Sequence, residues 1–194
     1  MDRGYRTIFW GVFFATFHIN LGPLPILPQF VGWIIVAVGI GKIQQEYSSA
    51  TFRKAGIFAP IIVVLALFSG VYSLYQGTAA VGSTYMFFSP ILFGIIEFLM
   101  EYAVLEGSVQ YFESHKEEMM ADEYIGKLRA YSVVFITFII LESIILTFYI
   151  EAFILIVALI GIVLRIWFMI MMSSLKKEMI NNNHSDPPGI DLLV

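Results

Sequence analysis

Four ionisable side chains stand inside long apolar runs of this chain, where a charge is expensive. Glu97 and Glu101 belong to one run, Glu142 to the next and Arg165 to the last. If these runs cross a membrane, each charge costs at least ~2.5–3.5 kcal/mol at mid-bilayer on insertion scales. Such residues usually face the interior of a helix bundle and mark ion pathways, proton relays or ligand sites. We therefore treat these four residues as the candidate ligand or proton site.

The spacing of these residues predicts an ion pair. Glu97 and Glu101 are four residues apart, which places them on one face of a helix. Arg165 lies about eight residues, or roughly 12 Å at 1.5 Å per residue, from the predicted cytoplasmic end of its run. The two glutamates fall at a comparable depth in a run with the same direction. A guanidinium carries a fork of donors that suits carboxylates, so we expect Arg165 within hydrogen-bonding reach of Glu97 or Glu101.

Three carboxylates then face one guanidinium. A carboxylate that this guanidinium does not neutralise needs a proton, a cation or a polar ligand. Glu142 is the best candidate for the functional carboxylate, because its neighbours one helical turn away are all apolar: Phe138, Ile139, Ile145 and Leu146. Two interpretations stay open. The charges form either a structural ion pair that orients helices or a site for transport or ligand binding.

The composition indicates an integral membrane protein. Of the 194 residues, 59% are hydrophobic and only 13% are charged, whereas about 25% charged residues are usual in soluble domains. The absence of Cys excludes thiol catalysis and cysteine-ligated metal sites. The net charge of −4 argues against a nucleic-acid partner. We expect no metal, no cofactor and no enzyme activity, because the sequence has no phosphate-binding loop and no serine elbow, and its His residues are scattered.

Six apolar runs predict an all-α, polytopic fold, with spans at about 5–19, 29–43, 57–76, 85–112, 128–150 and 152–172. Crossing about 30 Å of hydrocarbon takes roughly 20 residues, so the first two runs are short. They read as a hairpin across a proline-rich turn. The fourth run is too long for one straight span, and we expect its helix to continue through residues 113–124.

The basic residues fix the predicted orientation, because cytoplasmic flanks accumulate Lys and Arg. Ten of the eleven Lys and Arg residues flank the runs on one predicted side of the membrane: Arg3, Arg6, Lys42, Arg53, Lys54, Lys116, Lys127, Arg129, Lys176 and Lys177. The alternate connections contain none. We expect a multi-pass cell-membrane protein with both termini cytoplasmic. Residues 1–175 form a single six-helix transmembrane domain, and residues 176–194 a disordered tail.

The stretch Ile26-Leu27-Pro28-Gln29-Phe30-Val31-Gly32-Trp33, followed by Ser49-x-x-Phe52-x-Lys54-Ala55, resembles a pattern in small integral membrane proteins of Firmicutes. The resemblance covers about 45 residues and implies a cytoplasmic-membrane location in a Gram-positive bacterium, with no particular activity. Those proteins commonly carry Asp at the position of Gln29, so a charge-dependent role of that position is not implied for this chain.

Two functions fit the sequence. The first is a component for small-molecule transport or ligand binding, embedded in the lipid bilayer and using the buried carboxylates. The alternative is a non-catalytic interaction or scaffold protein, whose cytoplasmic segments 44–56 and 113–127 contact a protein partner. The second segment is acidic and is interrupted by two methionines, Met119 and Met120.

Overall fold

A computed structural model of the chain describes residues 1–17, 20–21, 24–25, 28–76, 84–148 and 151–185. These ranges contain six helices: α1 (Asp2–Thr16), α2 (Gln29–Glu46), α3 (Ala50–Gln76), α4 (Thr84–Ser114), α5 (Glu118–Thr147) and α6 (Glu151–Ser185). Between α1 and α2, β1 (Asn20–Leu21) pairs with β2 (Leu24–Pro25) in antiparallel register, with Asn20 opposite Pro25. The predicted all-helical class is confirmed.

Four of the helices are long and apolar enough to cross a membrane, with candidate spans Ala50–Tyr72, Phe88–Ser114, Glu118–Thr147 and Ala152–Ile180. Their outer faces also carry large exposed apolar side chains. On α5 these recur every three or four residues and so form one stripe along the helix: Val133, Ile136, Ile140 and Ile144. Contiguous apolar surface of this kind is rare on soluble monomers, and it fits a membrane protein.

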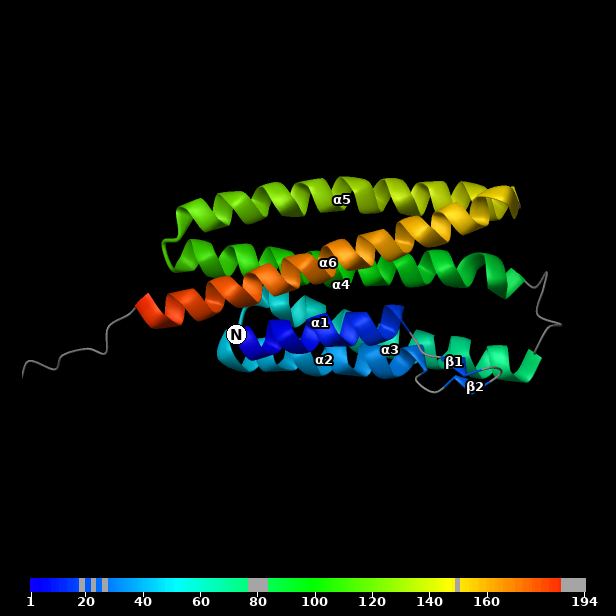
Figure 1. Ribbon diagram of the computed structural model, residues 1–194, viewed down its shortest axis with the longest axis horizontal. Coiled ribbons are helices and arrows are strands. Elements are labelled where there is room, and N and C mark those ends of the chain that lie inside the picture. The colour runs from blue at the N-terminus through cyan, green and yellow to red at the C-terminus, as the bar shows by residue number, and fades with distance from the viewer. Residues whose placement is uncertain (18–19, 22–23, 26–27, 77–83, 149–150, 186–194) are drawn as a thin grey trace, which may run out of the picture.

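Successive helices run in opposite directions along the long axis of the molecule (Figure 1). We call one end of the molecule the hairpin end. At this end β1 and β2 lie, α3 and α5 finish, and α4 and α6 begin. The tail end is the opposite one, where α1 and α3 begin and α6 finishes. The ten basic residues that predicted one cytoplasmic side all lie in the tail-end halves of their helices or in the turn between α4 and α5. Arg165 lies in the hairpin-end half of α6.

Helix α4 is the central element, because it contacts all the other helices. It contacts α1 through a 2.8 Å hydrogen bond between the hydroxyls of Tyr5 and Ser108. Its Phe93 packs edge-on against Trp33 of α2, with ring centroids 5.6 Å apart. It also packs against α3 and α5 and reaches α6 through a charged contact described below. A helix in this position must bury its polar residues among its neighbours.

Glycines bring α1 and α2 into backbone contact. A Cβ atom added at Gly32 would lie 2.3 Å from the backbone nitrogen of Ala15, and one added at Gly11 would lie 2.6 Å from that of Val36. No real side chain fits at such distances, so the two helices can approach this closely only because both positions are glycine. The short hairpin predicted from the sequence is therefore a tightly packed pair.

The structure corrects the predicted extension of the fourth run through residues 113–124. Helix α4 ends at Ser114, and Lys116 adopts a left-handed conformation with φ 61°. The Lys116 N–H donates to the Glu113 carbonyl and the Glu117 N–H to the Phe112 carbonyl. These two bonds form a Schellman cap, which stops the helix. The chain reverses there, and α5 begins at Glu118.

Two further boundaries differ from the predictions. Helix α3 begins at Ala50, so the predicted loop at 44–56 is largely helical. Helix α6 continues to Ser185, so the predicted disordered tail beginning at residue 176 is helical as far as that residue. Its buried side chains extend to Met179, which explains why packing keeps the helix intact. Residues 186–194 of the predicted tail lie outside the described ranges.

Candidate functional site

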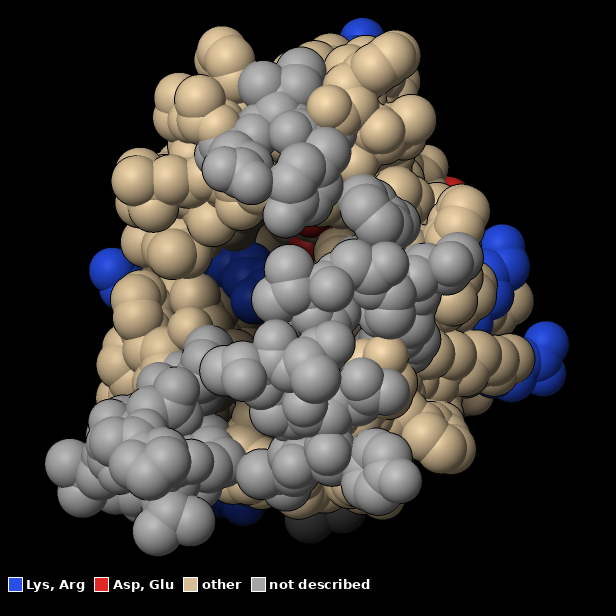
Figure 2. All heavy atoms as spheres, turned by 90° about the vertical axis from the view of Figure 1, so that its right-hand side faces the viewer, with Lys and Arg blue, Asp and Glu red and all other residues tan. Residues whose placement is uncertain are grey.

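A cavity of about 660 Å³ lies in the hairpin-end half of the bundle. Its walls come from the second halves of α3 and α5, the first halves of α4 and α6, and the first residue of α2. Viewed from the hairpin end, the molecule shows a hollow between its helices with both blue and red atoms inside it (Figure 2). The charged residues of the lining are Glu97, Glu142 and Arg165.

Two glycines in the lining, one on α4 and one on α6, help to leave this space open. Gly94 of α4 faces Glu142 of α5, and a Cβ atom placed there would lie 3.8 Å from a carboxylate oxygen of Glu142. Gly161 of α6 faces Phe138, with the corresponding distance 3.3 Å. Helix α6 also crosses the bundle obliquely, whereas α4 and α5 run side by side (Figure 1). The cavity lies between these three helices and is also lined by residues of α3 and by Gln29 of α2.

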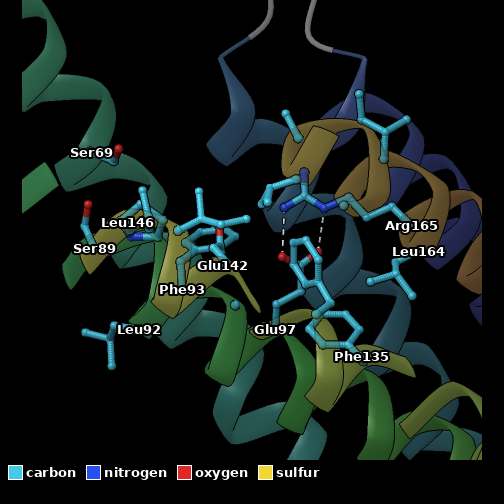
Figure 3. A pocket seen from close by; sticks show the side chains of 18 of the residues that line it. Ser69, Ser89, Leu92, Phe93, Glu97, Phe135, Glu142, Leu146, Leu164 and Arg165 are labelled. Atoms are coloured by element: carbon cyan, nitrogen blue, oxygen red, sulfur yellow. Dashed lines mark hydrogen bonds and ion pairs between the residues drawn. The ribbon is translucent and has the colours of Figure 1, made fainter. Parts of the chain in front are cut away.

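Arg165 and Glu97 form a bidentate ion pair on the cavity wall. The Arg165 Nε donates to Glu97 Oε1 at 2.7 Å, and Nη2 donates to Oε2 at 2.8 Å. Figure 3 shows the two groups facing each other across these contacts. The side chain of Glu97 is 4% exposed and that of Arg165 is 21% exposed. Trp33 lies 5.6 Å from the guanidinium, in the range of a cation–π contact. The predicted pairing is confirmed, and Glu97 is the partner.

Glu101 lies one turn further toward the tail end and has a different partner. The Tyr131 hydroxyl of α5 donates to Glu101 Oε2 at 2.5 Å. The residue is fully buried, and Oε1 has no hydrogen-bond partner among the described atoms. Glu101 is not among the residues that line the cavity. Sequence reasoning missed Tyr131, although a Tyr within an apolar run is a polar group that needs a partner when buried.

Glu142 differs from the other two carboxylates because it stands in the cavity itself (Figure 3). It is half-buried, on α5, and faces α4 at Gly94. Gly94 precedes Glu97 by three residues, or roughly 4.5 Å along a helix, so Glu142 lies nearer the hairpin end than the ion pair. Within the described ranges, no hydrogen bond or ion pair reaches its carboxylate.

The cavity lining also contains polar residues that were not predicted from the sequence to contact a ligand. Gln29 begins α2, and Ser69 and Ser89 add two hydroxyls on α3 and α4. Ser69, Ser73 and Gly77 recur every four residues in the sequence, a spacing of small residues that predicts close packing of this face against another helix. The side chain of Ser73 and all of Gly77 lie outside what the structure describes. The remaining walls are mostly aliphatic and aromatic, with four phenylalanines: Phe88, Phe93, Phe135 and Phe138.

Comparison of the whole chain with protein-family models, curated proteins and solved structures gave no match. The resemblance to small Firmicutes membrane proteins therefore stays a prediction, and the function must be argued from the cavity.

The charges of the cavity do not cancel. Arg165 is matched by Glu97, which leaves Glu142 as an additional carboxylate in a largely apolar space. A charge removed from water costs several kcal/mol unless something compensates it. The cavity can therefore hold either a proton on Glu142 or a positively charged group beside it, and its volume leaves room for more than a proton.

Proposed function

We propose that this protein is a multi-pass membrane component that binds a small molecule in the hairpin-end cavity, for transport or for capture at the membrane. Six helices cross the bilayer in this proposal, with the shorter α1 and α2 sheltered as one packed pair. Glu97, Glu142 and Arg165 form the polar wall of the binding site. Glu101 is outside the cavity lining, and its hydrogen bond from Tyr131 supports the position of α4 against α5.

The observation that carries the proposal is the isolated carboxylate of Glu142 inside an apolar cavity. A structural ion pair would need only Glu97 and Arg165, which already satisfy each other through two hydrogen bonds. A third charge beside this pair adds a desolvation cost without adding a contact to another helix. Intramembrane carboxylates of this kind mark ligand and proton pathways, and a concave apolar site with few polar groups is the usual form of a ligand site.

The direction of the cavity follows from the basic residues. If their concentration toward the tail end marks the cytoplasm, the hairpin end faces outward. The cavity then opens on the outer side of the cell membrane, and its ligand enters from there. We favour binding over catalysis because the lining residues that the structure describes include no His, Cys or Lys. The guanidinium of Arg165 is also held by a carboxylate.

A cavity-filling substitution tests this proposal. Ala158 lines the cavity on α6, whereas Ala152 of the same helix is exposed and outside it. The wild-type protein, gently extracted and analysed by native mass spectrometry, should retain a small molecule. Ala158→Phe should lose it, because the added ring occupies the cavity, and Ala152→Phe should keep it. A wild-type protein that retains no small molecule, or equal retention of the small molecule by both variants, would contradict the proposal.

A further inference from the structure

We propose that the ligand is an amphipathic organic cation, whose ammonium group binds Glu142 and whose apolar body lies among the phenylalanines of the cavity. This inference rests on the proposed function and names the chemical class of its ligand. Three features of the cavity lead to it: its charge, its aromatic lining and its size.

The charge of the cavity favours a cation. With Arg165 and Glu97 compensating each other, the charged side chains of the described lining carry one net negative charge, which belongs to Glu142. A positively charged ligand would compensate that charge without disturbing the ion pair. An anion would have to approach Arg165 while facing Glu97 and Glu142, and like charges brought together in a poorly hydrated site repel strongly.

The aromatic residues favour an organic ammonium group. Four phenylalanines line the same cavity as Glu142, and the ring of Phe93 also packs against Trp33. The faces of aromatic rings attract cations, and cages of aromatic residues are used to recognise alkylated ammonium groups. A carboxylate supplies the opposite charge and the hydrogen-bond acceptors that a primary amine requires.

The size of the cavity argues against an inorganic ion. A bare metal cation needs several oxygen ligands at short range, and among the described residues no group of three or more His, Cys, Asp or Glu could hold one. A volume of about 660 Å³ falls within the range of sites for drug-sized molecules. The aliphatic walls, which include Leu92, Leu146 and Ile154, would leave a small hydrated ion without ligands.

The inference can be tested with three probes that have closely similar phenylalkyl bodies. The probes are 4-phenylbutylammonium, 4-phenylbutanol and 4-phenylbutyrate, which are cationic, neutral and anionic at pH 7. Binding is measured by calorimetry on the full chain in lipid nanodiscs, with empty nanodiscs subtracted. We expect the ammonium probe to bind at least ~10-fold more tightly than the other two, a difference of about 1.4 kcal/mol.

Glu142→Gln supplies the decisive variant, because it keeps the shape of the side chain and removes its charge. It should weaken the binding of the ammonium probe at least ~10-fold, to an affinity close to that of the alcohol. Glu106→Gln is the matched control. Glu106 is also half-buried, but it lies nine residues beyond Glu97 on α4, roughly 14 Å away at 1.5 Å per residue, and outside the cavity. This control should bind all three probes like the wild-type protein.

Three results would overturn the inference. If the butyrate binds best, the site is built on Arg165. If all three probes bind equally and Glu142→Gln has no effect, the cavity binds apolar bodies without charge selection. In both cases a small molecule still binds in the cavity, so the proposed function stands, but the proposed ligand class is wrong. If none of the probes binds although the wild-type protein retains a small molecule in native mass spectrometry, the ligand class is again wrong. Failure of both experiments would remove the proposed function as well.

Discussion

Arg165 binds both oxygens of Glu97 through parallel hydrogen bonds of 2.7 and 2.8 Å, and this contact joins α6 to α4. Glu101 stands one helical turn away on the same face, yet its hydrogen bond comes from Tyr131 of α5. The two glutamates thus connect α4 to two different helices. Glu142 lines the cavity and has no hydrogen bond or ion pair within the part of the chain that the structure describes.

The first prediction concerns the stability that this ion pair contributes. Arg165→Leu leaves the Glu97 carboxylate buried without its cation, and breaking a buried pair costs about 3–5 kcal/mol. Combining Arg165→Leu with Glu97→Leu removes the stranded charge and should recover much of that loss. The measurement is the free energy of unfolding of each variant in detergent micelles.

Arg129→Leu is the control for this experiment, because Arg129 is exposed on α5 and surface substitutions usually change stability by less than about 0.5 kcal/mol. Equal destabilisation of the single and double variants would show that the pair does not act as a unit.

The second prediction concerns the contact between α1 and α2. Gly32→Ala places a methyl group on the backbone of Ala15, and overpacking of this kind typically costs about 1–3 kcal/mol. Gly41→Ala is the matched control on the same helix, since a Cβ atom there meets nothing within 4 Å. It should leave stability unchanged or raise it slightly, because alanine is the better helix former. A Gly32→Ala variant as stable as Gly41→Ala would disprove the close approach of these helices.

The pairing of the intramembrane charges could be predicted because helical spacing and depth decide which residues can meet. The pairing of Arg165 with a glutamate of α4 was therefore predicted correctly from the sequence. The choice of Glu97 over Glu101 depends on how α6 crosses α4, and Tyr131 becomes a partner only through the packing of α5. No spacing along one helix contains that information.

The boundary errors have a common physical origin. The turn at Lys116 is a Schellman cap with Lys in the left-handed position, where Gly or Asn is the usual signal. The charged residues around it favour helix locally, so the sequence predicted one. The end of α6 was placed too early for a similar reason. Polar residues follow Met172, but Leu175 and Met179 are buried against other helices, and this tertiary packing extends the helix.

The third prediction is the membrane topology, which the absence of Cys makes easy to test. Single cysteines introduced at positions 24, 80 and 150 should react with an impermeant thiol reagent in intact cells. Cysteines at positions 49, 114 and 185 should react only after the membrane is permeabilised. The pattern follows if ten basic residues lie on the cytoplasmic side. Labelling of position 114 in intact cells would exclude the six-span arrangement with cytoplasmic termini.

The most direct test of the binding site is an experimental structure of the full chain in lipid nanodiscs with 4-phenylbutylammonium present. We expect density for the probe in the cavity between α4, α5 and α6, with its ammonium group within hydrogen-bonding distance of Glu142. Arg165 should remain paired with Glu97, because the probe compensates a different carboxylate. A closed cavity without added density, with Glu142 turned toward the lipid acyl chains, would contradict the account.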